Sequence, residues 1–302
     1  MNTRVRHVFV IPRDKKGLNK IFAYFNLFKR LFNERYDLLA HFSVDWRGAI
    51  LARLLHVDIS VSRLTDRRGA FWHKSFDFLA PTLDDERPMA EQDVDLLRSA
   101  NLYKKSVAPA YELNISSLQK TKVNVWLKKH DIHAKNKLVV IHASSRWKFK
   151  EIPVSTWAQI IDELHSKKID IVISGSHDDL KTNEMIFNLC ESKPLLTTGF
   201  SLEDTAALYK QANLVLTIDS MSTHFASALK TPVISIFGPT NEKIWGPWKV
   251  KNSVISMSSI DDPVFTCRPC GQDGCEGSKI SQCLVQLNSR MILSEVYNFL
   301  KF

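Results

Sequence analysis

The sequence predicts an α/β protein with parallel β-sheets, and its second half carries most of the evidence. From residue 138 onward, short apolar segments rich in β-branched residues alternate with amphipathic segments of helical periodicity. Strands with continuous apolar runs are buried on both faces, so the pattern indicates a sheet with helices on each side. The length of 302 residues, about twice that of a typical domain, predicts two domains.

The alternation in the second half defines a regular series of elements. Strands are expected at residues 138–142, 169–174, 195–198, 214–218 and 233–237, and helices at 154–166, 178–190, 202–211 and 222–229. The carboxyl ends of parallel strands share one edge of a sheet, and ligands of such sheets bind there.

The first half is less regular. Strands are expected at residues 5–11, 37–42 and 58–62, and helices at 18–32, 46–55 and 89–101. Residues 103–120 lack periodicity and are the candidate interdomain linker. We therefore expect an N-terminal domain over residues 1–118 and a C-terminal domain over 119–302.

The charge distribution points to an acidic partner. The formal net charge is +9, and residues 1–35 carry +7 of it, from nine Lys and Arg against Asp14 and Glu34. An anionic membrane surface, a phosphorylated substrate and nucleic acid all fit such a bias. No nucleic-acid-binding motif accompanies the charge, so nucleic acid is not expected. The basic, aromatic helix at 18–32 is either a core-facing helix or an interfacial helix on an anionic bilayer.

Other sequence signals are missing. Neither GxGxxG nor GxxxxGK[ST] occurs, no apolar run is long enough to span a membrane, and the first residues do not resemble a signal peptide. We therefore expect a cytoplasmic protein.

Two loops at predicted strand ends carry candidate ligand-binding residues. After strand 138–142, Ser144, Ser145 and Lys150 offer hydroxyls and a cation suited to a phosphate, or else form a solvated loop that caps the next helix. After strand 214–218, Asp219 could accept from sugar hydroxyls and His224 could donate to a phosphate, with Ser222 as the expected N-cap of a helix whose amides attract anions. Alternatively, Asp219 is a capping residue and His224 a core residue.

A third loop, residues 237–248, brings Trp245 and Trp248 to the same predicted edge, where they could stack on a base or a sugar ring. The convergence of three loops on one edge predicts a binding site there.

Four of the five cysteines lie close together in the sequence, at Cys267, Cys270, Cys275 and Cys283. Their spacing makes them a candidate structural zinc site, with reduced thiols or one reversible disulfide as the alternatives. Cys190 is expected in the core.

Several segments resemble glycosyltransferase family 9, which contains the bacterial lipopolysaccharide heptosyltransferases. These are DSMSTHFA at residues 219–226, TPV at 231–233, FGPT at 237–240, WGPW at 245–248, DWRGAILARLL at 45–55 and RGAFW at 68–72, together with Ser144, Ser145, Arg146 and Lys150. The similarity runs from about residue 5 to the C-terminus.

The resemblance implies a GT-B fold, in which two doubly wound Rossmann-like domains flank a cleft. The implied reaction is inverting transfer of heptose from ADP-L-glycero-D-manno-heptose to a heptose of the lipopolysaccharide inner core, at the cytoplasmic face of the inner membrane. The C-terminal domain would bind the donor and the N-terminal domain the acidic glycolipid acceptor, without a cofactor. By position, the implied donor-binding residues are Ser144, Ser145, Lys150, Asp219, Ser220 and His224.

One feature of the family pattern is missing. Family members carry the proposed catalytic Asp in a Gly-Asp loop near the N-terminus, and this sequence contains no Gly-Asp pair. We therefore expect an incomplete N-terminal domain with weak or no transferase activity, and the catalytic base is unassigned. Asp14 and Asp45 are weak substitutes. The alternatives are a non-catalytic glycolipid- or nucleotide-binding remnant and a relative that uses another nucleotide sugar.

Overall fold

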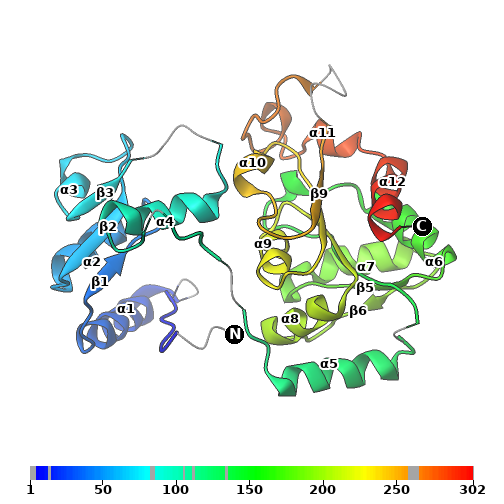
Figure 1. Cartoon of the computed structure of the whole chain (residues 1–302), viewed down its shortest axis with the longest axis horizontal. Coiled ribbons are helices and arrows are strands. Elements are labelled where there is room, and N and C mark those ends of the chain that lie inside the picture. Colours follow the sequence, from blue (N-terminus) through cyan, green and yellow to red (C-terminus); the bar gives the residue numbers. More distant parts are fainter. Residues whose placement is uncertain are drawn as a thin grey trace. The chain divides into compact units, whose positions relative to one another are not determined.

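The computed structural model describes residues 5–12, 15–81, 86–104, 106–110, 113–132, 135–257 and 265–301. The chain forms two compact units, Thr3–Pro109 and a C-terminal unit that begins at Ala110 (Figure 1). The division therefore falls before the expected position at 118/119, which lies inside helix α5 (Ser117–Lys129). Ser116 caps this helix, and α5 buries Val123 and Leu127 in the C-terminal unit.

The N-terminal unit has a three-stranded parallel sheet in the order β1-β2-β3. Its elements are α1 (Gly17–Phe32), β1 (Leu38–Ala40), α2 (Trp46–Leu54), β2 (Ile59–Arg63), α3 (Ala70–His73), β3 (Phe78–Ala80) and α4 (Met89–Ser99). Small apolar clusters hold it together, one of them around Trp72 and Phe76. The His41 ring stacks on Phe76, and it fits only because Gly48 lacks a Cβ, which would lie 2.2 Å from the ring.

The strand expected at residues 5–11 is wrong, because residues 5–12 form no strand. The side chains of Val8 and Val10 are exposed. A run of β-branched residues favours a strand only where a neighbouring strand completes its hydrogen bonds and its side chains pack on a core.

Helix α1 has the predicted length and periodicity, but none of its 16 residues is buried. Leu18, Ile21, Phe22 and Phe25 are all exposed. The core-facing interpretation is therefore not what the structure shows. No helix among the described residues is long and apolar enough to cross a bilayer.

The C-terminal unit has a six-stranded, all-parallel sheet in the order β6-β5-β4-β7-β8-β9 (Figure 1). Its strands are β4 (Leu138–His142), β5 (Asp170–Ile173), β6 (Leu195–Leu196), β7 (Leu214–Ile218), β8 (Val233–Ile236) and β9 (Asn252–Ile255). After β4, the chain adds β5 and β6 on one side of β4. It then returns to form β7 on the other side of β4, and adds β8 and β9 beyond β7. The order therefore reverses between β4 and β7, the place where ligands of doubly wound sheets bind.

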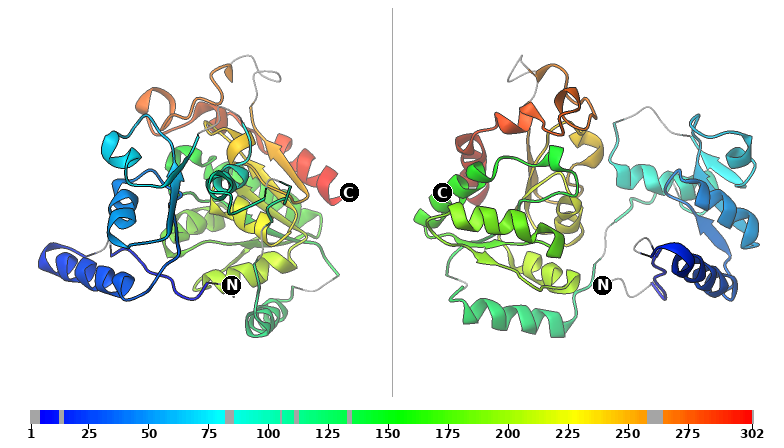
Figure 2. Two further views of the ribbon diagram at one scale, coloured as in Figure 1. Left: turned by 60° about the vertical axis from the view of Figure 1, so that its left-hand side comes forward. Right: turned by 180° about the vertical axis from the view of Figure 1, so that it is seen from behind.

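Helices cover both faces of this sheet, as expected (Figure 2). The helical elements of this unit are α5, η1 (Lys148–Lys150), α6 (Val154–Ser166), η2 (His177–Asp179), α7 (Leu180–Leu189), α8 (Leu202–Gln211), α9 (Met221–Ala228), α10 (Glu242–Trp245), η4 (Cys275–Gly277), α11 (Gln282–Val285) and α12 (Ser289–Leu300). Alternate residues of β4 face opposite ways. Val139 and Ile141 pack in one core with α6, α7 and α12, while Leu138 and Val140 pack in the other with α5, α8 and α9. This double burial explains the continuous apolar runs in the sequence.

Candidate functional site

A cavity of about 1130 Å³ lies at the carboxyl edge of the six-stranded sheet, where the strand order reverses. Every residue that lines it belongs to the C-terminal unit. The loops after β4 and β7 flank the reversal and supply Ser144, Ser145, Lys150, Asp219 and Ser220 to its walls. His224 and Trp245 line it too, whereas Trp248 does not belong to the lining. The structure thus brings together all six predicted donor-binding residues.

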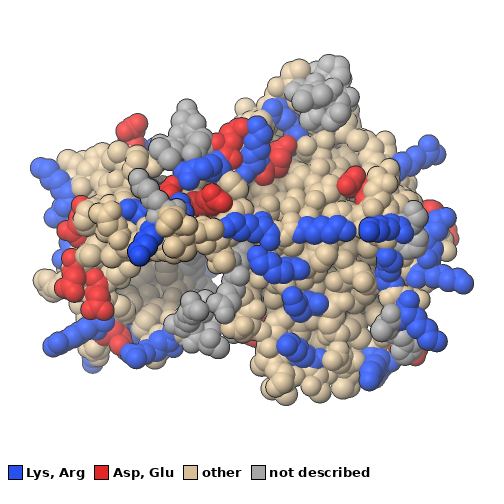
Figure 3. All heavy atoms as spheres, viewed as in Figure 1, with Lys and Arg blue, Asp and Glu red and all other residues tan. Residues whose placement is uncertain are grey.

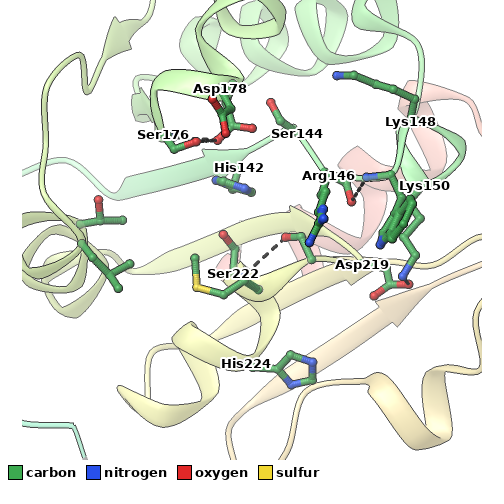
Figure 4. A pocket seen from close by; sticks show the side chains of 18 of the residues that line it. His142, Ser144, Arg146, Lys148, Lys150, Ser176, Asp178, Asp219, Ser222 and His224 are labelled. Atoms are coloured by element: carbon green, nitrogen blue, oxygen red, sulfur yellow. Dashed lines mark hydrogen bonds and ion pairs between the residues drawn. The ribbon is translucent and has the colours of Figure 1, made fainter. Parts of the chain in front are cut away.

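Lys150 and Asp219 form an ion pair inside this cavity, with 2.7 Å between Nζ and Oδ2. Their side chains are only 18% and 8% exposed. Figure 4 shows Lys150 reaching Asp219 on one side of the pocket, while Ser176 and Asp178 lie on the opposite side. Burial removes water from both charges, so each depends on the other for compensation. An anion that enters the cavity would offer Lys150 a second acceptor.

Helix α9 points its N-terminus at the same cavity. Ser220 is its N-cap, because the Ser220 hydroxyl accepts from the backbone N–H of Ser222 at 3.3 Å. The expected N-cap at Ser222 is therefore wrong. Ser220 has the extended backbone of a cap, and Ser222 lies in the first turn of the helix that follows. Backbone N–H groups of a first turn have no partner within the helix and attract anions.

His224 lies on α9 beside the ion pair. Burial lowers the pKa of His224, Asp219 opposes this effect, and Lys150 adds to it. The imidazole is therefore neutral near pH 7, with one N–H to donate and one nitrogen to accept. Its ring meets that of Trp245 edge-on at 6.5 Å, so α10 closes this side of the cavity.

The loop after β4 divides its polar groups between the cavity and its own structure. The Ser145 N–H donates to Glu151 at 2.9 Å, and its hydroxyl accepts from Trp147 at 3.2 Å. Lys148 pairs with Glu151 and also donates to Thr182. Ser145 therefore stabilises the loop itself and does not cap the next helix, because neither η1 nor α6 has a side-chain cap. Lys150 is the cation that the loop directs to Asp219.

Apolar side chains also line the cavity. They are those of Phe200, Leu202 and Met221, and the buried Tyr209 belongs to the lining as well. Sequence reasoning missed Phe200, Leu202 and Tyr209 because they follow β6, a strand of two residues without binding motifs. The rule that ligands bind at carboxyl ends of parallel strands would have pointed to this loop as well.

The C-terminal cysteines do not form the candidate metal site. Cys267 and Cys270 are exposed, Cys283 is buried, and all are free thiols. Among the residues that the structure describes, no group of three or more His, Cys, Asp or Glu side chains could hold a metal ion. Burial raises the pKa of Cys283 to about 11, so this thiol stays protonated.

The segment between the first two of these cysteines has a structural role. Arg268 is buried and donates to the carbonyl oxygens of Gly238 at 2.6 Å and Met257 at 3.0 Å, and it pairs with Glu242 on α10. These contacts hold the turn after β8 and, through α10, the Trp245 side of the cavity.

Asp45 does not fit the role of a substitute base. Asp45 caps α2 and accepts hydrogen bonds from Arg47 and Ser43, and the bond from the Arg47 side chain is the main reason that the pKa of Asp45 is well below its usual range. A carboxylate held in this way is a poor proton acceptor. Asp14 lies outside the described residues.

Comparisons with known proteins identify the family of this chain. The family model of glycosyltransferase family 9 (heptosyltransferase) matches residues 24–269. Lipopolysaccharide heptosyltransferase 3 of Escherichia coli is 29% identical over 275 residues, which are 86% of this chain and 76% of the relative. The protein of that name from E. coli strain K12 is also 29% identical, over 82% of this chain and 72% of the relative.

Solved structures show the same fold. A glycosyltransferase family 9 protein from Veillonella parvula superposes with a TM-score of 0.75 at 18% identity, covering 95% of this chain and 80% of that one. The E. coli ADP-heptose lipopolysaccharide heptosyltransferase II gives 0.70 at 17% identity, covering 93% and 82%. The fold is therefore that of a GT-B glycosyltransferase. The chain belongs to glycosyltransferase family 9, the heptosyltransferases.

The lowered pKa of His224 predicts a pH-dependent stability. The unfolded chain protonates this imidazole near its ordinary pKa of about 6.5, and the folded chain only at lower pH. The unfolded state therefore binds more protons in this window. As a result, the free energy of unfolding decreases as the pH falls below about 6.5. We expect His224→Gln to lose less stability than the wild type between about pH 7.5 and pH 5.5 in thermal unfolding followed by circular dichroism.

His165→Gln is the matched control, since His165 is exposed and lies outside the cavity, and it should keep the wild-type profile. An unchanged pH profile in His224→Gln would contradict the prediction.

Proposed function

We propose that the C-terminal unit binds ADP-L-glycero-D-manno-heptose and that the enzyme transfers the heptose, with inversion, to a heptose of the lipopolysaccharide inner core. The observation that carries the proposal is the meeting of Lys150, Asp219, His224 and the α9 N-terminus in one cavity. Two relatives named lipopolysaccharide heptosyltransferase 3 support the acceptor class. A neighbour in fold, the E. coli heptosyltransferase WaaC, was solved with ADP and supports the donor class (TM-score 0.65).

The diphosphate would lie over the first turn of α9, beside Lys150. Backbone N–H groups of α9, the Ser220 hydroxyl and the Lys150 ammonium would donate to its oxygens, with Ser144 and Ser145 at the loop after β4. His224 has one N–H for a phosphate oxygen, and Asp219 would accept from hydroxyls of the sugar. Elsewhere in the lining, Phe200 and Leu202 offer an apolar surface for the base, and Asp178 offers an acceptor for the ribose.

This arrangement supplies the main catalytic effect that the reaction needs. When the anomeric carbon leaves the diphosphate, negative charge develops on the departing oxygen. Lys150 and the positive end of the α9 dipole would stabilise this charge inside a cavity with little water. The acceptor hydroxyl attacks the opposite face of the anomeric carbon and loses its proton to a general base.

The N-terminal unit would bind the acidic acceptor. Arg67 is exposed in the loop that follows β2, at the carboxyl edge of the three-stranded sheet.

Figure 3 shows Lys and Arg spread over the face of the C-terminal unit that it displays, with fewer Asp and Glu. Such a field raises the local concentration of anionic substrates.

The decisive test of the donor site is the binding of ADP. We expect Lys150→Met to weaken ADP binding at least about tenfold in isothermal titration calorimetry, because a charge-assisted hydrogen bond to a phosphate is lost. The same change at Lys148 should cost only a few-fold, since Lys148 is largely exposed and shared with Glu151.

A double variant, Lys150→Met with Asp219→Asn, removes both charges of the pair and separates lost binding from lost stability. Wild-type protein that fails to bind ADP, or equal losses at Lys148 and Lys150, would contradict the donor site. ADP binding without turnover of ADP-heptose would instead support the non-catalytic alternative, and tighter binding of another nucleoside diphosphate would favour a different donor.

We further propose that the enzyme works at the cytoplasmic face of the inner membrane and that α1 contacts the anionic lipid surface. The support is an exposed apolar face on a helix that also carries Lys20, Lys29 and Arg30. Helices of this composition lie in the headgroup region of anionic bilayers.

Co-sedimentation with vesicles tests this contact. The protein should bind vesicles that contain anionic lipid and show little binding to zwitterionic ones. Phe22→Glu with Phe25→Glu should abolish binding, because both side chains are exposed on α1. Leu118→Glu with Val125→Glu places the same charges on exposed positions of α5 and should leave binding near the wild-type level. Equal losses in both pairs would contradict a specific role of α1.

A further inference from the structure

Tyr209 lies in the wall of the cavity, but none of the roles described above uses it. It lies on α8 and is fully buried, with its ring edge-on to Phe225. Its hydroxyl is 3.0 Å from the Ser174 Oγ and 3.0 Å from the Ser222 Oγ. A single phenol therefore joins the end of β5 to the first turn of α9.

The directions of these hydrogen bonds determine what Ser222 can do. The Tyr209 hydroxyl donates to the Ser222 Oγ. The single proton of the Ser174 hydroxyl has two acceptors within reach, the Ile141 carbonyl at 3.2 Å and the Tyr209 oxygen at 3.0 Å. Ser222 thus receives a hydrogen bond, and its one hydroxyl proton has no acceptor among the described residues.

The position of Ser222 in the lining of the cavity indicates which acceptor its hydroxyl proton can reach. Its side chain is 1% exposed, yet it lines the cavity, on the His142 side of α9 in Figure 4. It lies in the first helical turn, next to N–H groups that attract an anion. A buried hydroxyl that has a donor to spare in a cavity is expected to meet a ligand acceptor.

We propose that Ser222 donates its hydroxyl proton to a phosphate oxygen of the donor and that Tyr209 is the positioning residue that turns the proton into the cavity. This proposal rests on the proposed function, because it assumes a diphosphate over α9. Ser222 is thus a further binding residue of that site, and its contribution depends on the Tyr209 hydroxyl.

Loss of the Tyr209 hydroxyl would redirect Ser222. A serine inside a helix commonly donates to the carbonyl four residues earlier, which here is that of Ile218. That carbonyl already accepts from Thr217 and Thr223, at 3.1 and 3.2 Å, so a third hydrogen bond would be poor but still available. In Tyr209→Phe the Ser222 proton would spend part of its time away from the ligand.

A double-mutant cycle on the full chain, with ADP and adenosine as probes, tests the proposal. Ser222→Ala should weaken ADP binding about tenfold, as expected for a lost hydrogen bond to a charged group. Tyr209→Phe should weaken it several-fold in the wild-type background and have no effect in the Ser222→Ala background. Adenosine binding should stay at the wild-type value in all three variants, because adenosine has no phosphate.

Tyr297→Phe is the matched control, since it removes a tyrosine hydroxyl bonded to Glu163, outside the cavity, and it should leave both affinities unchanged. The proposal is overturned if Tyr209→Phe binds ADP as the wild type does, weakens ADP and adenosine equally, or costs the same with and without Ser222. If the wild-type protein binds ADP and Lys150→Met weakens that binding, any of these results would overturn only the roles of Tyr209 and Ser222. The donor-site proposal would be retained. Wild-type protein that does not bind ADP would overturn both proposals.

Discussion

The ion pair between Lys150 and Asp219 can form only because β4 and β7 are neighbours in the sheet. Two strands and three α-helices separate β4 from β7 along the chain. Their pairing brings the loop that follows each strand to the same edge. The same reversal of strand order opens the cavity between those loops. A cation, a carboxylate and a helix N-terminus therefore meet in one place as a consequence of topology.

The electrostatics of the cavity follow from its burial. Two opposite charges withdrawn from water satisfy each other, and His224 beside them stays neutral because burial lowers its pKa. The pair is thus neutral overall, but it contains a lysine that a stronger anion could bind. The polar contacts of Tyr209, Ser174 and Ser222 add neutral donors that are held in place before a ligand arrives. Such preorganisation limits the reorganisation that binding and bond cleavage require.

The sequence predicted the parallel sheet and most of the site, because parallel strands share a carboxyl edge and Ser144, Lys150, Asp219 and His224 follow strands with a clear apolar pattern. It failed where a local pattern depends on distant partners. Residues 5–11 have the composition of a strand but pair with none. The predicted domain division at 118/119 lies inside α5, a helix that the sequence did not predict because it buries few residues and its periodicity is weak.

Local ambiguity explains the remaining differences. Ser220 and Ser222 are equally good caps by residue type, and only the backbone conformation shows that Ser220 is the cap.

A crystal structure of the full chain with ADP would test the central claim most directly. The account predicts a diphosphate within hydrogen-bond distance of Lys150 Nζ and of the first-turn N–H groups of α9. A nucleotide bound outside this cavity, or a diphosphate without contact to Lys150 and α9, would contradict it.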